Sequence, residues 1–160
     1  MAQIGVKPLP AAPETVPQRR PAARRVAAGA PARRHEGRFD IEYFGDSILG
    51  LVEGGDQRQL HRLQRGDIHI EIQLDLHGHS EVAARKRVEE SVDHAYSYGK
   101  RCLLVIHGRG HRSAGAPVLK HALPDWLTGP RCAARVLAFC SAPAELGGAG
   151  ATLVLLRRRR

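Results

Sequence analysis

The strongest candidates for catalytic residues in this chain are two His-Gly pairs. Each pair comes directly after an apolar run. His77-Gly78 follows residues 70–76, and His107-Gly108 follows residues 102–106. Histidine is the side chain most often used as a general acid or base near neutral pH. Glycine lets the backbone approach a ligand closely. Two imidazoles beside glycine loops therefore predict acid–base chemistry on an anionic group such as a phosphodiester.

A carboxylate accompanies the first imidazole. Asp75 and His77 are two residues apart and would share one face of a strand, where the carboxylate can fix the tautomer of the ring. Leu74 and Leu76 already supply the apolar face, so neither polar residue is needed in the core. The alternative is that Asp75 is an ordinary polar strand residue and His77 merely ends the strand. We predict Asp75, His77 and His107 as the catalytic residues.

The glycine loops are candidate phosphate-binding elements. Gly78 leads into a helix that begins at Ser80, and helix N-termini bind phosphate through free N–H groups and the helix dipole. In the second loop, Gly108 and Gly110 flank Arg109 and permit exposed N–H groups and positive φ angles. Arginine side chains would stabilise charge on the phosphate. The predicted phosphate- or nucleic-acid-binding residues are Gly78, Gly108, Arg109, Gly110 and Arg112.

A metal centre is the competing interpretation of the same histidines. His77, His79, His107 and His111 form an H-x-H and an H-x-x-x-H pattern, and zinc accepts imidazole ligands. The three cysteines have no CxxC spacing, so no residue is predicted as a metal ligand. No cofactor is predicted for RNA cleavage, where the 2′-hydroxyl can be the nucleophile. A divalent metal is expected only if DNA is cut, because a water must then attack.

The elements around these residues predict that the two histidines meet. Residues 70–76 alternate apolar and polar side chains, as a strand does, and residues 102–106 form the continuous apolar run of a buried strand. Between them, a helix is predicted from the cap Ser80 to about Tyr98. A strand–helix–strand unit is right-handed with parallel strands, which places both strand ends at one sheet edge.

The remaining pattern predicts four strands and two main helices. A second helix follows Pro117, with Pro124 expected to kink or shorten it. Residues 136–140 and 151–156 are the third and fourth strands. Residues 39–51 are expected to dock on the domain as an extended strip or to bind a partner. The short helix that follows, opened by Asp56, has a basic face formed by Arg58, His61, Arg62 and Arg65.

Composition divides the chain into three parts. Residues 1–38 are rich in Pro, Ala and Arg and are predicted to be a disordered basic arm. Residues 39–69 form an N-terminal extension with a short helix, and residues 70–160 form the folded domain. The net charge of +9 favours polyanionic partners, whereas the aromatic content of 4% disfavours a base-stacking platform. Reduced cysteines, no membrane span and no secretion signal predict a cytoplasmic protein. The protein is also expected to be a monomer.

Four motifs together resemble the small MutS-related (Smr) domain over about residues 70–157. They are Leu74-Asp75-Leu76-His77-Gly78, His107-Gly108-Arg109-Gly110, Gly115-Ala116-Pro117-Val118-Leu119-Lys120 and Gly147-Gly148-x-Gly150-Ala151. The helix that ends at Gly66 is similar to that of the stand-alone, SmrB-type bacterial branch. His79 departs from the pattern, since an apolar residue is usual there.

The resemblance implies an α/β two-layer sandwich with a four-stranded mixed sheet, as in the C-terminal domain of translation initiation factor three. It also implies an endonuclease that nicks DNA or cleaves RNA, including messenger RNA on ribosomes. The family's acidic-x-His element corresponds to Asp75 and His77, and its HGxG loop to His107, Gly108 and Gly110. The alternatives are a non-catalytic module that binds nucleic acid or the ribosome and a zinc-dependent hydrolase.

Overall fold

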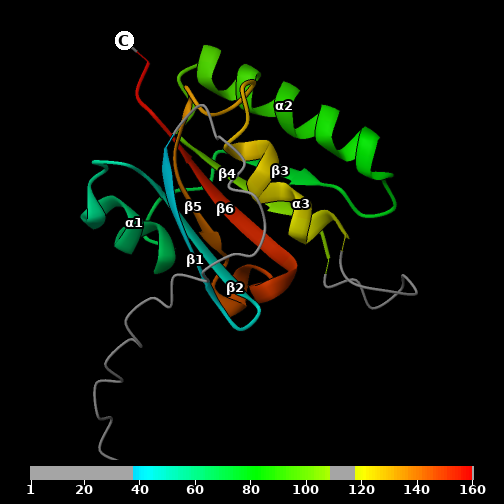
Figure 1. Cartoon of the computed structure of the whole chain (residues 1–160), viewed down its shortest axis with the longest axis horizontal. Coiled ribbons are helices and arrows are strands. Elements are labelled where there is room, and N and C mark those ends of the chain that lie inside the picture. The colour runs from blue at the N-terminus through cyan, green and yellow to red at the C-terminus, as the bar shows by residue number, and fades with distance from the viewer. Residues whose placement is uncertain (1–37, 109–117, 160) are drawn as a thin grey trace, which may run out of the picture.

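A mixed six-stranded sheet with helices on both faces forms the protein in a computed structural model that describes residues 38–108 and 118–159 (Figure 1). The strand order is β1-β2-β5-β6-β4-β3. In chain order the elements are β1 (Phe39–Phe44), β2 (Ser47–Val52), α1 (Gln57–Gln64), β3 (Ile72–Asp75), α2 (Glu81–Ser97), β4 (Cys102–Ile106), α3 (Val118–Leu127), β5 (Val136–Ser141), the short 3-10 turns η1 (Ala144–Leu146) and η2 (Gly148–Gly150), and β6 (Ala151–Leu156).

The predicted strand–helix–strand unit is present as β3, α2 and β4. β3 and β4 are parallel, and Asp75 lies opposite Ile106 at their carboxyl ends. The hydroxyl of Ser80 caps α2 by accepting a hydrogen bond from the Ala83 N–H at 3.2 Å. β6 runs antiparallel to β4, so the start of β6 lies at the same sheet edge as the ends of β3 and β4.

The prediction of four strands is wrong, because residues 39–52 form two further strands. β1 and β2 form an antiparallel hairpin, and β2 pairs with β5. The turn of the hairpin contains Gly45 at φ +56°, a conformation that favours glycine. The hairpin pairs the backbone groups that β5 would otherwise leave at an open edge. The segment expected to dock as an extended strip therefore completes the sheet.

The helices occupy both faces of the sheet, so the expected two-layer arrangement gains a third, partial layer. α2 and α3 bury Val88, Val92, Leu123 and other apolar side chains against one face. α1 packs Leu60 and Leu63 against β5 and β6 on the other face. Figure 1 shows α1 apart from the α2 and α3 pair. α3 continues through Pro124 to Leu127 rather than stopping at the proline.

Two sequence predictions fall on residues outside the described ranges. The disordered arm predicted for residues 1–38 overlaps the described chain only at Arg38, and the loop of residues 109–117 is not described. Within residues 38–108 and 118–159, no helix has the length and apolar character needed to cross a bilayer.

Candidate functional site

Asp75 and His77 form a hydrogen-bonded pair at the carboxyl end of β3. Asp75 Oδ1 lies 2.6 Å from His77 Nδ1 and also accepts the His77 backbone N–H at 3.0 Å. The His77 side chain is 81% exposed and that of Asp75 is 47% exposed. Because a carboxylate only accepts hydrogen bonds, Nδ1 carries the proton and Nε2 of the neutral ring presents its lone pair to solvent.

The two hydrogen bonds from His77 keep Asp75 ionised. The backbone N–H of His77 is the largest cause, and its ring the second, of a pKa for the Asp75 carboxyl below the usual value. An ionised carboxylate favours a proton on Nδ1 and stabilises the ring after Nε2 gains a second proton. The pair therefore has the arrangement of a general base with an orienting carboxylate.

A glycine turn connects this pair to the N-terminus of α2. Gly78 has φ +74°, and the N–H of His79 donates to the carbonyl of Leu76 at 3.1 Å. Within the described part of the chain, the Gly78 N–H has no hydrogen-bond acceptor. It lies two residues before the Ser80 cap, next to the free N–H groups of the first helical turn. This turn can hold an anionic oxygen beside His77.

His107 occupies a different environment from His77, although β3 and β4 end side by side. The residue is only 7% exposed. Its Nδ1 lies 2.9 Å from the carbonyl oxygen of Gly108, and its Nε2 lies 2.9 Å from the hydroxyl of Thr152. Thr152 and Val154 are two residues apart in β6 and share the sheet face that α2 and α3 cover, whereas Leu153 lies on the other face. Asp75, next to the buried Leu74, points to the opposite face.

The hydrogen bonds define the state of the His107 ring. A carbonyl only accepts, so Nδ1 carries a proton and Nε2 accepts from Thr152. Burial is the main cause of a pKa for His107 below its ordinary value, and the charge of Lys120 lowers it further. A neutral ring with both nitrogens occupied is suited to holding the loop after β4 and poorly suited to donating a proton to a leaving group.

Two residues that were not among the predicted site residues hold this loop: Gly150, which belongs to the last of the four motifs, and Thr152. The N–H groups of His107 and Gly108 both donate to the carbonyl of Gly150, at 3.1 and 2.9 Å. The Gly108 N–H is thus already used, and φ +78° at Gly108 serves the turn. Thr152 is the single polar residue in the apolar run 151–156, a signal that could have identified it.

The stability of the protein should fall as the pH decreases below about 6.5, in part through His107. Because the folded pKa lies below the ordinary value of 6.5, the unfolded chain binds the proton more readily. The stabilisation is complete above the ordinary pKa and is lost as the pH falls through it towards the folded pKa. His107→Gln removes this titration. Urea unfolding over the pH range should give the variant a shallower dependence than the parent.

The exposed His94 of α2 provides the matched control for this measurement. His94→Gln should keep the pH dependence of the parent, because the His94 ring is exposed and the ring it contacts, that of Tyr98, is exposed too. Identical pH dependence in the parent and in His107→Gln would contradict the burial argument.

Three of the predicted phosphate-binding residues are not placed by the structure. Arg109, Gly110 and Arg112 lie in the undescribed range 109–117, and they stay predictions. The alternative metal site is affected in the same way, since His111 lies there too. Among residues 38–108 and 118–159, no three His, Cys, Asp or Glu side chains are grouped as metal ligands would be.

Comparison with known proteins gives one family and two kinds of relative. Residues 74–157 match the Smr domain family. Ribosome rescue factor SmrB proteins from Shewanella sp. (strain ANA-3) and Shewanella oneidensis are 36% identical over 124 residues, which cover 71% of this chain and 66% of each relative. The chain thus spans slightly less than two thirds of their length. The crystal structure of YdaL, a stand-alone small MutS-related protein from Escherichia coli, superposes with a TM-score of 0.62 at 25% identity, covering 80% of this chain and 93% of YdaL.

Proposed function

This chain belongs to the Smr domain family, and on that premise we propose that it is an endonuclease that cleaves phosphodiester bonds in RNA. The observation that carries the proposal is the exposed Asp75–His77 pair, whose Nδ1 to Oδ1 distance is 2.6 Å. A general base with a free lone pair is the group needed to activate the 2′-hydroxyl of RNA. The name of the relatives, ribosome rescue factor SmrB, also supports RNA over DNA.

His77 is the catalytic base in this proposal. Its Nε2 takes the proton of the 2′-hydroxyl, and the 2′-oxygen forms a bond to phosphorus while the bond from phosphorus to the 5′-oxygen breaks. Asp75 stabilises the imidazolium that results. The departing 5′-oxygen takes a proton from water, and the hydroxide that remains takes the Nε2 proton of His77, which restores the neutral ring. The products are a 2′,3′-cyclic phosphate and a 5′-hydroxyl.

The phosphate lies, in this proposal, over the turn between β3 and α2. The Gly78 N–H and the first turn of α2 contact its oxygens, and the dipole of the helix favours the negative charge. Arg109 and Arg112 are proposed to complete this contact from the neighbouring loop. The hydrogen bonds from His107 and Gly108 to Gly150 fix the first two residues after β4, from which that loop continues. His107 is therefore proposed as a positioning residue, not as a second acid or base.

The partner that follows from the relatives' name is the ribosome, and such a role places the protein in the cytosol. A second candidate, a module that binds RNA without cutting it, is favoured by the net charge of +9 because basic proteins bind polyanions without a catalytic site. The two candidates differ in one respect. Substitution of His77 abolishes RNA cleavage if the protein is an endonuclease, and it leaves RNA binding unchanged if the protein is a binding module.

Incubation of the purified chain with end-labelled RNA and with supercoiled DNA, each with and without EDTA, tests the proposal. We expect cleavage of RNA in the presence of EDTA, because the 2′-hydroxyl and His77 supply the nucleophile and the base. The 3′ products should carry a cyclic phosphate and the 5′ products a free hydroxyl. Cleavage of DNA alone, or RNA products with 5′-phosphates, would show that water attacks and that the mechanism is wrong.

A further inference from the structure

A basic pocket lies at the other end of the strands from the Asp75–His77 pair. It is formed where β3 and β4 begin and β6 ends, and its volume is about 250 Å³. α1 closes one side. The lining residues include Gln59 and Arg62 from α1, Ile68 and Glu71 before β3, Arg101 before β4, Leu155 in β6 and Arg158 after it. We refer to this set as the basic pocket.

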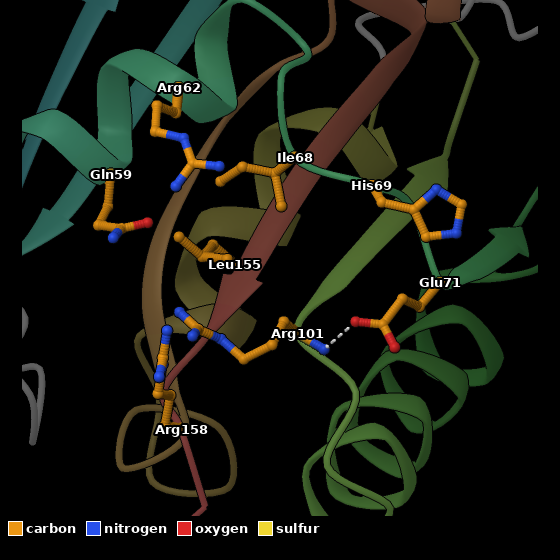
Figure 2. Close-up of a pocket in the computed structure, with 8 residues that line it drawn as sticks. All are labelled: Gln59, Arg62, Ile68, His69, Glu71, Arg101, Leu155 and Arg158. Carbon is orange, nitrogen blue, oxygen red and sulfur yellow. Dashed lines mark hydrogen bonds between the residues drawn. The ribbon is translucent and has the colours of Figure 1, made fainter.

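Three guanidinium groups converge on this pocket from separate elements. Figure 2 shows Arg62, Arg101 and Arg158 turned towards a common space above Leu155, with the Gln59 amide at its side. Arg101 is fixed there, since its Nε donates to the Leu156 carbonyl at 2.8 Å and its backbone N–H donates to Glu71 Oε1 at 2.9 Å. Among residues 38–108 and 118–159, the other donors of the three guanidinium groups have no hydrogen-bond acceptor.

The positive charge of the pocket is not neutralised within the described residues. There, neither Arg62 nor Arg158 has an ion pair. Glu71, the lining carboxylate, already accepts the Arg101 N–H and lies 3.7 Å from Lys100 Nζ. Burial first, and the charge of Arg158 second, lower the pKa of Arg101. Guanidinium groups held together in this way favour a bound anion.

We infer that the basic pocket binds a backbone phosphate of a single-stranded RNA, away from the bond that is cut. Guanidinium groups bind phosphate oxygens in pairs of hydrogen bonds. Pockets for whole small ligands measure roughly 300–1,000 Å³, so 250 Å³ suits one phosphate unit of a chain that continues outside. The choice of RNA rests on the proposed function, whereas the phosphate chemistry does not.

The pocket and the Asp75–His77 pair lie on the same side of the sheet. Leu155 and Ile68 belong to the apolar cluster on the α1 face, and Asp75 points to that face too. α1 packs on β5 and β6, and no helix of the described residues covers the α1 side of β3 and β4. The distance between the two positions is about the length of the five-residue strand β4, roughly 17 Å at about 3.3 Å per residue. One RNA strand can contact both, so the pocket should set affinity and not the chemical step.

Salt-dependent binding of RNA tests this inference. In a His77→Ala background, which prevents cleavage, we compare the full chain with and without Arg62→Gln and Arg158→Gln, using a fluorescent single-stranded RNA of about 20 nucleotides. The two substitutions should weaken binding at least about tenfold, since each removes a charged hydrogen bond. They should also reduce the slope of log K against log salt by about 0.7, the value for loss of one phosphate contact to a single strand.

Lys86→Gln with Arg87→Gln is the matched control, because both residues are exposed on α2 and the charge change is the same. An equal loss in the control would show that only net charge matters and would overturn the inference. Tight binding of a nucleoside monophosphate by the parent, lost in the Arg62 and Arg158 variant, would also overturn it in favour of a free nucleotide.

Cleavage of a dinucleotide separates this inference from the proposed function. A dinucleotide is too short to reach the pocket, so Arg62→Gln with Arg158→Gln should cut it at the rate of the parent while binding the long RNA weakly. If the parent cuts no RNA, the proposed function fails, and the salt dependence of RNA binding still tests whether the pocket binds phosphate. If the parent cuts RNA and the slope is unchanged, only the pocket fails.

Discussion

His77→Ala should reduce RNA cleavage by about 10²- to 10⁴-fold, the range by which a positioned general base accelerates proton transfer. Its binding of RNA should stay close to that of the parent. His77 is 81% exposed and contributes no packing, so the substitution removes the base without disturbing the fold. Single-turnover cleavage of labelled RNA with enzyme in excess measures the chemical step, and anisotropy measures the affinity.

Two further variants test whether a loss of cleavage in His77→Ala comes from loss of the general base. Asp75→Asn should lower the rate by about 10- to 100-fold, because a hydrogen bond to a charged group contributes about 1.5–3 kcal/mol and the amide cannot stabilise an imidazolium. His94 is an exposed histidine on α2, and the His94→Ala variant should cut RNA at the parent rate. Cleavage by His77→Ala at the parent rate would refute the mechanism, whereas absence of cleavage by the parent would leave the binding module as the better account.

The strand–helix–strand unit could be predicted because its signals are local. The alternation before Asp75, the Ser80 cap and the apolar run of residues 102–106 each specify one element, and the handedness rule specifies how they join. The position of Asp75 and His77 at a strand end follows from the same reasoning. Their 2.6 Å contact needs only two residues of one short segment.

The hairpin of β1 and β2 could not be predicted in this way, because its pairing with β5 joins residues nearly a hundred positions apart. Ile48 N–H, for example, donates to the hydroxyl of Ser141 at 2.9 Å. The sequence of residues 39–51 shows apolar content but not its partner. An extended strip and an edge hairpin bury similar side chains, and only the unpaired edge of β5 decides between them.

The different environments of the two histidines could not be predicted from the sequence pattern either. His77-Gly78 and His107-Gly108 have the same form and both follow strands. Their difference comes from the sheet order, in which β3 is the edge strand and β4 lies between β3 and β6. A side chain at the end of an edge strand meets solvent, whereas His107 meets Thr152 on the next strand at 2.9 Å. Burial by a neighbour distant in sequence cannot be read from a dipeptide.

Phe139→Ala should destabilise the protein by about 3–5 kcal/mol, the usual effect of removing a fully buried aromatic side chain. Phe139 is 0% exposed in β5 and its ring centroid lies 6.2 Å from that of Phe39 in β1. The ring also lies over Gly50 of β2, where a Cβ atom would overlap it. This side chain therefore joins the hairpin to the rest of the sheet. Urea unfolding at a constant m-value measures the loss.

Tyr43→Ala is the control for this experiment, since it truncates an aromatic residue of the same hairpin that is 56% exposed. We expect it to change the free energy of unfolding by about 0.5 kcal/mol or less. A loss below about 1 kcal/mol in Phe139→Ala, outside the usual range for a buried ring, would show that the hairpin is not held by this contact. Because β1 and β2 lie at the opposite end of the strand order from β3, the fraction of Phe139→Ala that stays folded should still cleave RNA at the parent rate. The hairpin then contributes stability to the sheet, and the Asp75–His77 pair contributes the chemistry.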